Sequence, residues 1–597
     1  MRHRAALLLT LFGFAAASHA QTAFTDVSDA SPDLAAPLNA WGTSWVDCDG
    51  DGDDDLYAGR ETDQLTTANA LYRNDGGTLV RVAGAFDGAP PALGHTWGDV
   101  DNDGDLDVLT TGAGGSALFL NDGACAFTRA TGTPLDGDVR GWAAAFGDYD
   151  ADGWLDVVIA HPAFFVGTPV QTNHLFRGTG GGALERVAEG PVVTGTAPYT
   201  VPSWSDYDLD GDLDLFIGSG PADGSLGPDY LYRNLLRETG TATFERLTDA
   251  PLATDRRDGQ VMNWVDMDAD GDLDLLVTNF TGPAGQQPPH QYRNDGGTYT
   301  RVTGTPLSTD VSGLGLANTW ADVDHDGDLD VFLTTGGPPS STGEDRLYLN
   351  DGAGAFTRLD DGSVFVTRRA PTSGASFGDL DGDGDLDLAV SEQAATLGPR
   401  VRVWRNDLAS ARAWLRVRLV GTASNRAGIG ARVWVLAGGR WMHREVSAQN
   451  SFNGHNALTA HVGLGDASAA DSVRVEWPSG IVDRLAAVAG HQTLTVVEGQ
   501  TVADAPGPGG TGLRLAVPAP NPAAGAATVR FEVPAAGPVR LTLLDAVGRV
   551  VAVLADGARA AGAHTVRVDT AGLAAGLYVV RLAHAAGVVV RPLAVAR

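Results

Sequence analysis

The 597-residue chain carries 74 acidic residues against 41 lysines and arginines, which gives a formal net charge of -33. The acidic excess lies in repeated loops, and acidic and basic residues are nearly balanced elsewhere, so no basic stripe is available to bind nucleic acid. After the first twenty residues no run reaches about 18 uninterrupted apolar residues, which argues against a membrane-spanning segment.

Residues 1–20 have the pattern of a secretory signal peptide. Two arginines precede an apolar run, and the small residues Ser18 and Ala20 suit signal peptidase cleavage before Gln21. No cysteine follows this site, which argues against a lipoprotein. The sequence therefore predicts an exported chain that begins at Gln21.

One nine-residue motif, Asp-x-Asp-x-Asp-Gly-x-x-Asp, occurs seven times, and a period of this length indicates one supersecondary unit per repeat. Alternate carboxylates in a tight loop converge on one point, and a highly charged set of oxygen ligands selects Ca²⁺. We expect one structural Ca²⁺ in each loop, about seven in all. The predicted metal ligands, at positions 1, 3, 5 and 9 of the first to seventh loops, are Asp47, Asp49, Asp51 and Asp55; Asp99, Asp101, Asp103 and Asp107; Asp148, Asp150, Asp152 and Asp156; Asp206, Asp208, Asp210 and Asp214; Asp266, Asp268, Asp270 and Asp274; Asp322, Asp324, Asp326 and Asp330; and Asp379, Asp381, Asp383 and Asp387.

Position 7 of the motif is expected to contribute its backbone carbonyl. Six loops have Asp there but the third has Trp154, which can supply a carbonyl and no carboxylate. An EF-hand is excluded, because it needs flanking helices and a Glu at position 12, whereas a short apolar strand follows each loop. A metal-free acidic turn is the alternative for a single loop, but burying seven such clusters without a cation would be strongly repulsive.

Each repeat reads as four short strands. Phrases such as LYRNDGGTLVRV and LFLNDGACAFTRA place Asn-Asp-Gly at a hairpin turn. Seven four-stranded antiparallel units predict an all-β fold with a seven-bladed β-propeller over residues 21–407. The last unit lacks its final Phe-Thr strand, and residues 24–27 supply that phrase before the first loop. The N-terminus should therefore complete the last blade and remove the open sheet edges.

The loops and the residues that lead into them, as in Phe146-Gly147-Asp148 and Phe377-Gly378-Asp379, resemble FG-GAP repeats over residues 24–407. Such repeats form the propellers of integrin α-chains and of many bacterial surface proteins. The resemblance implies that the calcium is structural and that ligands bind through variable loops on the face opposite the metal loops.

The chain has only two cysteines, Cys48 and Cys125. A bridge between them is possible in an oxidising compartment. Cys48 lies inside the first metal loop, however, and Cys125 lies in a turn of the next unit. These positions favour two unpaired thiols.

Residues 408–499 are predicted to form a small β-sandwich or barrel, because alternating apolar strands are separated by Gly-rich turns. From residue 411 onward, phrases such as AWLRVRLVG, NRAGIGARVWVLAGG and VRVEWPSGIVDRL resemble the ASPIC/UnbV domain. That domain usually follows FG-GAP repeats, as it does here, and its molecular activity is not established. Trp434, Trp441 and Trp477 are expected in its core rather than in a sugar-binding platform.

Two other features of this region could indicate a site. The segment 425–430, Asn-Arg-x-Gly-x-Gly, could bind phosphate, but no helix follows it, so a structural turn is favoured. His443, His455 and His461 lie near Glu445 in the sequence, but they have no zinc-motif spacing and no obvious nucleophile. Catalysis by this group is disfavoured.

Residues 500–512 form a Pro/Gly linker, and residues 513–597 are rich in Ala, Val and Gly with few acids. Pro520-Asn521-Pro522 and the GLYVV phrase at 576–580 resemble a type IX secretion C-terminal sorting domain. An ordinary Ig-like β-sandwich is the alternative, and the expected fold is the same. The resemblance implies recognition by the type IX secretion machinery of a Gram-negative bacterium, removal of the domain, and a secreted or cell-surface product.

Two classes of function remain for the mature chain, which we expect to be a monomer. The favoured class is a binding or adhesion module for a glycan or an extracellular protein. The alternative is a calcium-dependent polysaccharide-degrading enzyme, which as a lyase would need a base beside charge-stabilising groups. His95, His161, His174 and His290 are candidates, but each also fits an ordinary polar loop residue, and the catalytic residues stay unknown.

Overall fold

The computed structural model contains two compact units, which are Met1–Asp483 with Ala487–Glu498, and Arg484–Ala486 with Gly499–Arg597. The signal peptide and most of the linker lie outside the described residues. None of the described helices is long and apolar enough to cross a membrane. The described residues are 24–35, 37–60, 69–86, 89–90, 92–162, 171–220, 225–283, 285–337, 344–359, 371–393, 400–408, 411–500, 514–515, 525–533, 535–544, 550–573, 576–584 and 587–595.

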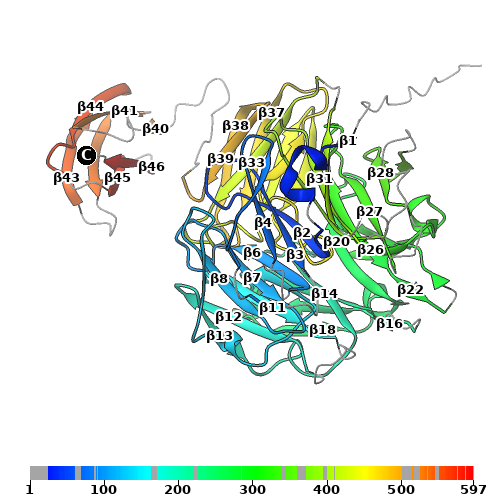
Figure 1. Cartoon of the computed structure of the whole chain (residues 1–597). Helices are drawn as coiled ribbons and strands as arrows, with labels where there is room; N and C mark the ends of the chain where they lie inside the picture. The colour runs from blue at the N-terminus through cyan, green and yellow to red at the C-terminus, as the bar shows by residue number, and fades with distance from the viewer. Residues whose placement is uncertain are drawn as a thin grey trace, which may run out of the picture. The chain divides into compact units, whose positions relative to one another are not determined.

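Seven four-stranded antiparallel sheets follow one another along the first unit (Figure 1), and in each an acidic loop joins the first strand to the second. The first strands are buried almost throughout, and those of neighbouring sheets contact one another around the ring. The chain is therefore the predicted β-propeller. Its blades consist of β2 (Ala40–Val46), β3 (Asp55–Arg60), β4 (Ala70–Asn74) and β5 (Leu79–Arg81); β6 (Gly94–Gly98), β7 (Asp107–Thr111), β8 (Ala117–Asn121) and β9 (Phe127–Arg129); β10 (Ala143–Gly147), β11 (Asp156–Ala160), β12 (His174–Gly180) and β13 (Ala183–Val187); β14 (Tyr199–Ser205), β15 (Asp214–Ser219), β17 (Tyr230–Asn234) and β18 (Phe244–Leu247); β20 (Gly259–Val265), β21 (Asp274–Asn279), β24 (His290–Asp295) and β25 (Thr298–Val302); β26 (Leu314–Ala321), β27 (Asp330–Gly336), β28 (Arg346–Asn350) and β29 (Phe356–Arg358); and β30 (Thr372–Gly378), β31 (Asp387–Glu392), β32 (Arg400–Asn406) and β1 (Phe24–Asp26).

Short elements occupy some of the connections between and within the blades. Among them, β16 pairs with β19 and β22 pairs with β23. They are η1 (Ser28–Ala30), η2 (Pro32–Ala35), η3 (Pro134–Asp136), η4 (Leu307–Thr309), α1 (Leu236–Thr239), α2 (Pro251–Thr254), β16 (Gly227–Pro228), β19 (Arg256–Arg257), β22 (Thr281–Gly282) and β23 (Gly285–Gln286).

The N-terminal strand closes the ring as the sequence predicted. β1 pairs antiparallel with β32, and Phe24 lies opposite Asn406. On the inner side, β30 of the last blade contacts β2 of the first. Closure of this kind leaves the last blade with its full set of four strands and protects its edge.

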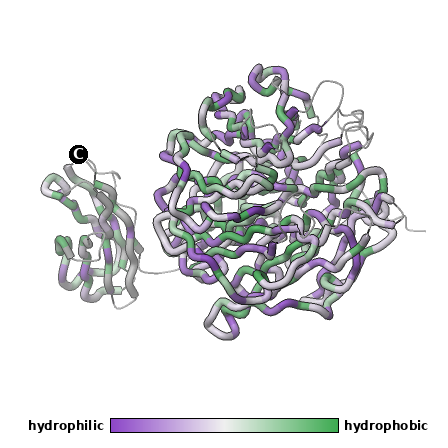
Figure 2. Tube along the Cα trace, turned by 60° about the horizontal axis from the view of Figure 1, so that its bottom comes forward, coloured by the Kyte–Doolittle hydropathy of each residue, from purple (hydrophilic) through white to green (hydrophobic). Residues whose placement is uncertain are grey.

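Apolar side chains between adjacent blades form the core. One cluster joins Trp45 and Leu56 of the first blade to Val401 and Val403 of the last. Equivalent clusters join the first blade to the second and the fifth to the sixth. Hydrophobic and hydrophilic residues alternate over short stretches of the trace, as expected for thin sheets that bury alternate side chains (Figure 2).

Cys48 and Cys125 form a disulfide, with their Cα atoms 5.1 Å apart. The expectation of two unpaired thiols is therefore wrong. The first metal loop lies directly against the β8–β9 turn of the second blade, where the Cys125 N–H donates to the Cys48 carbonyl at 3.4 Å. This proximity depends on how adjacent blades stack, which the spacing of the two cysteines does not reveal.

The region after the propeller forms two sheets, in the orders β36-β33-β39 and β35-β34-β37-β38. Trp434 and Trp477 are buried there as expected, but Trp441 is 39% exposed, so its assignment to the core is wrong. Trp441 lies on the edge strand and alternates with the buried Met442. The strands are β33 (Trp414–Val420), β34 (Arg432–Ala437), β35 (Arg440–Glu445), β36 (Ala460–Gly463), β37 (Ala469–Glu476), β38 (Val482–Ala489) and β39 (Gln492–Val497).

The C-terminal unit also contains two sheets, in the orders β40-β41-β44 and β43-β42-β45-β46. Its core includes Phe531, Leu541 and Leu582. This is the expected β-sandwich. The strands are β40 (Arg514–Leu515), β41 (Ala526–Val533), β42 (Gly537–Leu544), β43 (Val550–Arg559), β44 (Gly562–Asp569), β45 (Gly576–His584) and β46 (Gly587–Val595).

Candidate metal loops

The carboxylate at position 1 closes the second to seventh loops on themselves. In the second loop, Asp99 Oδ2 accepts the N–H of Gly104, at position 6, at 2.8 Å. Gly104 has a φ of 111°, a conformation that strongly favours glycine. The same bond from position 6 to position 1 occurs in the third to seventh loops. The motif's Gly therefore allows the turn that gathers the carboxylates.

The carboxylate at position 9 links its loop to the third strand of the blade. Asp107 Oδ2 accepts the N–H of Val100 at 2.9 Å, and its Oδ1 accepts the N–H of Asn121 at 2.9 Å. Both bonds recur at position 9 of the first, third, fifth, sixth and seventh loops. Position 9 is therefore a structural cross-link as well as a predicted ligand.

The structure brings predicted ligands of the loops together. Oxygen atoms of positions 1, 3 and 9 lie within 4.8 Å of one another in each of the first three loops, and those of positions 1, 3 and 5 do so in the fourth. Such a spacing allows several oxygens to contact one cation.

Several of these carboxylate oxygens are buried without a hydrogen-bond donor. A buried, unsatisfied carboxylate oxygen is costly, and a hard cation is the partner that would satisfy several of them at once. The residues present therefore fit Ca²⁺. The atoms include Oδ1 of Asp47, Asp49, Asp150, Asp206, Asp266, Asp268 and Asp322, and Oδ2 of Asp214.

Burial makes the charged form of these groups unfavourable. It raises the pKa of Asp99 to about 7 and that of Asp107 to about 8, and the neighbouring carboxylates add to both shifts. A divalent cation at the centre would offset this repulsion and favour the ionised carboxylates. When bound, it would brace the loop that joins the first two strands of a blade.

An asparagine at the end of the third strand connects the loops of adjacent blades. Asn121 uses its N–H for the second loop, and its side-chain Nδ2 donates to the carbonyl of Cys48 in the first loop at 2.7 Å. Asn74, Asn234, Asn350 and Asn406 make the same bond to the preceding blade's loop. The sequence analysis places this asparagine at a hairpin turn and does not predict its bond to the preceding blade. Its recurrence at one position of the repeat is the sequence signal for that role.

Three protein-family models match parts of the chain. The model for the FG-GAP-like repeat matches residues 47–110, 99–159, 206–277, 266–333 and 322–390. The model for the ASPIC and UnbV domain matches residues 421–503, and that for the secretion system C-terminal sorting domain matches residues 519–596. The chain is an FG-GAP repeat protein with an ASPIC and UnbV domain. We refer to residues 411–499 below as the ASPIC domain.

Curated relatives share part of this arrangement. Cartilage acidic protein 1 of Mus musculus is 26% identical over 294 residues, which are 46% of this chain and 42% of that protein. The Homo sapiens protein is 27% identical over 264 residues, which are 43% and 38% of the two chains. The alignments thus span less than half the length of these relatives.

One similar solved structure is described as the structural basis of specific recognition of non-reducing terminal N-acetylglucosamine by an Agrocybe aegerita lectin. The match covers 65% of this chain and 94% of that chain. The identity is 16% and the TM-score is 0.36.

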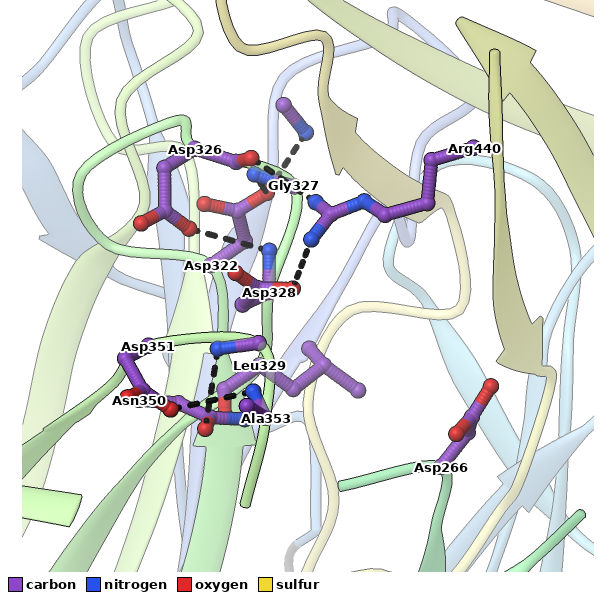
Figure 3. Close-up of polar contacts among 12 residues, drawn as sticks. Asp266, Asp322, Asp326, Gly327, Asp328, Leu329, Asn350, Asp351, Ala353 and Arg440 are labelled. Carbon is purple, nitrogen blue, oxygen red and sulfur yellow. Dashed lines mark hydrogen bonds and ion pairs between the residues drawn. The ribbon is translucent and has the colours of Figure 1, made fainter. Parts of the chain in front are cut away.

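The ASPIC domain contacts the propeller at the metal loops through arginines. Arg416 donates to Asp54 at 2.8 Å and to Asp379 at 2.9 Å, in the first and last blades. Figure 3 shows Arg440 directed at the sixth loop, where it pairs with the side chain of Asp328 and the carbonyl of Asp326. Arg418, Arg432 and Arg444 pair with Asp47, Asp206 and Asp322.

A loop of the ASPIC domain, residues 447–457, enters the centre of the ring. The His455 N–H donates to Ser44 Oγ on β2 at 2.9 Å, and Asn456 Nδ2 donates to a carbonyl on β26 at 2.9 Å. The ring of Phe452, which is fully buried, lies 6.1 Å from that of Trp41. We call this segment the plug loop, since it fills space between the first strands of several blades.

The histidines and the acid of the ASPIC domain hold it to the propeller or to itself. His461 Nε2 lies 2.9 Å from the carbonyl of Gly384 in the seventh loop. Glu445 accepts the Ser205 hydroxyl at 2.7 Å. His443 packs on Trp434 with ring centres 4.4 Å apart, and His455 belongs to the plug loop. The three histidines and Glu445 thus make separate structural contacts and share no common partner among those described.

The segment 425–430 is a turn closed by its own side chain. Asn425 accepts the Ile429 N–H at 2.9 Å through Oδ1 and donates to the Ile429 carbonyl at 2.8 Å through Nδ2. This bears out the preference for a structural turn over a phosphate site.

The four candidate lyase histidines lie in three different blades. His95 is on β6, His161 and His174 belong to the third blade, and His290 is on β24. Burial lowers the pKa of His174 to about 4 and that of His290 to about 2, so both are neutral near pH 7. Among the described residues these histidines therefore do not share one catalytic group.

Proposed function

We propose that this protein is an exported binding module for a glycan or an extracellular protein, with a propeller braced by Ca²⁺. The secretion sorting domain at residues 519–596 indicates export to the cell surface or the extracellular space. Calcium in the loops is supported above all by the buried carboxylate oxygens that have no donor. We also propose that seven ions are bound, one in each loop, by the carboxylates at positions 1, 3, 5 and 9.

The position of the ASPIC domain leaves one end of the propeller available to a ligand. It covers metal loops through its arginines, and the plug loop contacts the first strands at the centre. The opposite end carries the connections from second to third strands, such as those around β16 and β22. Since connecting loops can vary without disturbing the blades, we place the ligand there.

A binding assay with product analysis tests this function. The calcium-loaded full chain is incubated with a panel of polysaccharides and extracellular matrix proteins, and both retained ligand and new chain ends are measured. Retention of one ligand without release of product, lost on addition of a chelator, is the expected result.

Release of unsaturated sugar products would contradict the binding function and favour the polysaccharide-degrading enzyme. Retention that persists after chelation would contradict the role given to calcium while leaving the binding function intact. The two outcomes separate the parts of the proposal.

A further inference from the structure

The arginines of the ASPIC domain divide the metal loops into two groups. Position 1 of the first, fourth, sixth and seventh loops is paired with a guanidinium. The pairs are Asp47 with Arg418, Asp206 with Arg432, Asp322 with Arg444, and Asp379 with Arg416. We call these the arginine-paired loops.

The second, third and fifth loops lack such a partner. In the described part of the chain, no guanidinium forms an ion pair with the carboxylates of Asp99, Asp148 or Asp266. Arg177, an exposed arginine of the propeller itself, lies 3.9 Å from Asp150 at position 3 of the third loop. The ASPIC domain meets the second loop through a backbone group instead, where the Arg426 N–H donates to Asn102 Oδ1 at 3.0 Å. We call these the unpaired loops.

In the arginine-paired loops, the guanidinium and a cation would contact different oxygens of the same carboxylate. In Asp206, Oδ2 receives both Arg432 and the Gly211 N–H, whereas Oδ1 is buried without a donor. Asp322 has the same division, with Arg444, Gly327 and Gly463 all at Oδ2. Arginine and cation can therefore be present together, but as neighbouring positive charges.

The first loop shows that this pairing is specific. Asp54 stands at position 8, where the other six loops have leucine. Its side chain is only 4% exposed and is paired with Arg416, which also reaches Asp379 of the seventh loop. The first loop, which pairs with both Arg416 and Arg418, thus has one buried carboxylate more than the motif requires.

We propose that the ASPIC domain supplies built-in counter-ions to four of the seven loops and thereby creates two classes of calcium site. The unpaired loops bind Ca²⁺ more tightly, because no arginine of the ASPIC domain places a second positive charge on their position-1 carboxylate. The arginine-paired loops bind more weakly, because a single and a double positive charge about 5 Å apart repel by enough to change affinity about tenfold even in water. This inference rests on the calcium proposal above.

The functional consequence is graded dependence on calcium. When calcium falls, the four weaker sites empty first, and their arginines still compensate the carboxylates. The ASPIC domain then stays on the propeller while three ions remain bound. The domain would thus act as a positioning element for the loops rather than as a ligand-binding site of its own.

Calcium retention in a graded chelator series tests the proposal. The full chain is dialysed against buffers of decreasing free calcium, and bound calcium is counted by elemental analysis. We expect a plateau at three ions after four have left. Arg432→Gln should move the fourth loop into the tight class, raise the plateau to four and tighten that site about tenfold or more.

Four further variants assign the sites. Arg432→Lys keeps the charge and should keep the plateau at three. Arg301→Gln is the control, since Arg301 pairs with Asp255 at 3.5 Å, outside the metal loops, and it should also leave three. Asp99→Asn should lower the plateau to two, whereas Asp206→Asn should leave it at three. A melting curve at saturating calcium checks that each variant is folded.

Seven equivalent sites would overturn this inference while leaving the calcium proposal intact. So would a plateau that Arg432→Gln does not change, or one lowered by Asp206→Asn. Absence of bound calcium in every buffer would instead overturn the calcium proposal itself, and this inference with it.

Discussion

Arg416→Met should destabilise the first unit more than any loss of a surface charge. Arg416 links the first blade to the last through Asp54 and Asp379, at 2.8 and 2.9 Å. The three side chains are 8%, 4% and 1% exposed, so water cannot replace the guanidinium. Methionine fills a similar volume but leaves two buried carboxylates without their shared partner.

The expected loss in the free energy of unfolding follows from the burial of these charges. Removing one member of a buried ion pair costs about 3–5 kcal/mol, because the remaining charge is left uncompensated. Arg405→Met is the matched control. Arg405 pairs with Asp407 and lies 3.9 Å from Asp381, but the three side chains are 39%, 37% and 30% exposed, and such exposed pairs contribute about 0–1 kcal/mol each.

Urea denaturation at saturating calcium measures both variants. Asp54→Leu, which installs the residue found in the other six loops, should recover part of the loss when added to Arg416→Met, because it removes one of the two uncompensated charges. Equal free energies of unfolding for Arg416→Met and Arg405→Met would refute the view that buried arginines hold the ASPIC domain to the ring.

Other predictions concern the plug loop, the metal loops and the sorting domain. Gly42→Ala should cost about 1–3 kcal/mol in urea denaturation, since its Cβ would lie 1.9 Å from the Asn453 carbonyl oxygen, whereas Gly137→Ala, whose nearest neighbour would be 3.6 Å away, should be nearly neutral. Equal costs would contradict the close approach. Asp101→Ala should remove one bound calcium by elemental analysis, and loss of all calcium would show that the loops are not independent. Deleting residues 513–597 should abolish surface display without changing the circular dichroism spectrum of the rest, and normal display would refute the sorting function.

Features that depend on local spacing could be predicted from the sequence. The acidic loops, the strands on either side of them and the completion of the last blade by Phe24–Asp26 all follow from short motifs and their order. The ligand set was also local, because alternate residues of one tight loop must converge. The structure brings three of the four predicted ligands together in each of the first four loops, while the full ligand sets, the bound ions and the position-7 carbonyl stay predictions.

Contacts between blades and domains could not be predicted in the same way. The Cys48–Cys125 disulfide needs the stacking of two blades, and the arginine pairs need the position of the ASPIC domain on the ring. Two signals were nevertheless present in the sequence. Asp54 departs from the leucine of the other loops, and an asparagine closes the third strand in six repeats. Each marks a residue whose partner lies in another part of the fold.

The most direct test of the central claim is thermal melting of the full chain in excess calcium and after chelation. Each site that binds only the folded state adds about 2.7 kcal/mol when calcium is at a hundred times its Kd. The account predicts a large fall in Tm on chelation, reversed by adding calcium. An unchanged melting curve would contradict the assignment of the seven acidic loops as calcium sites.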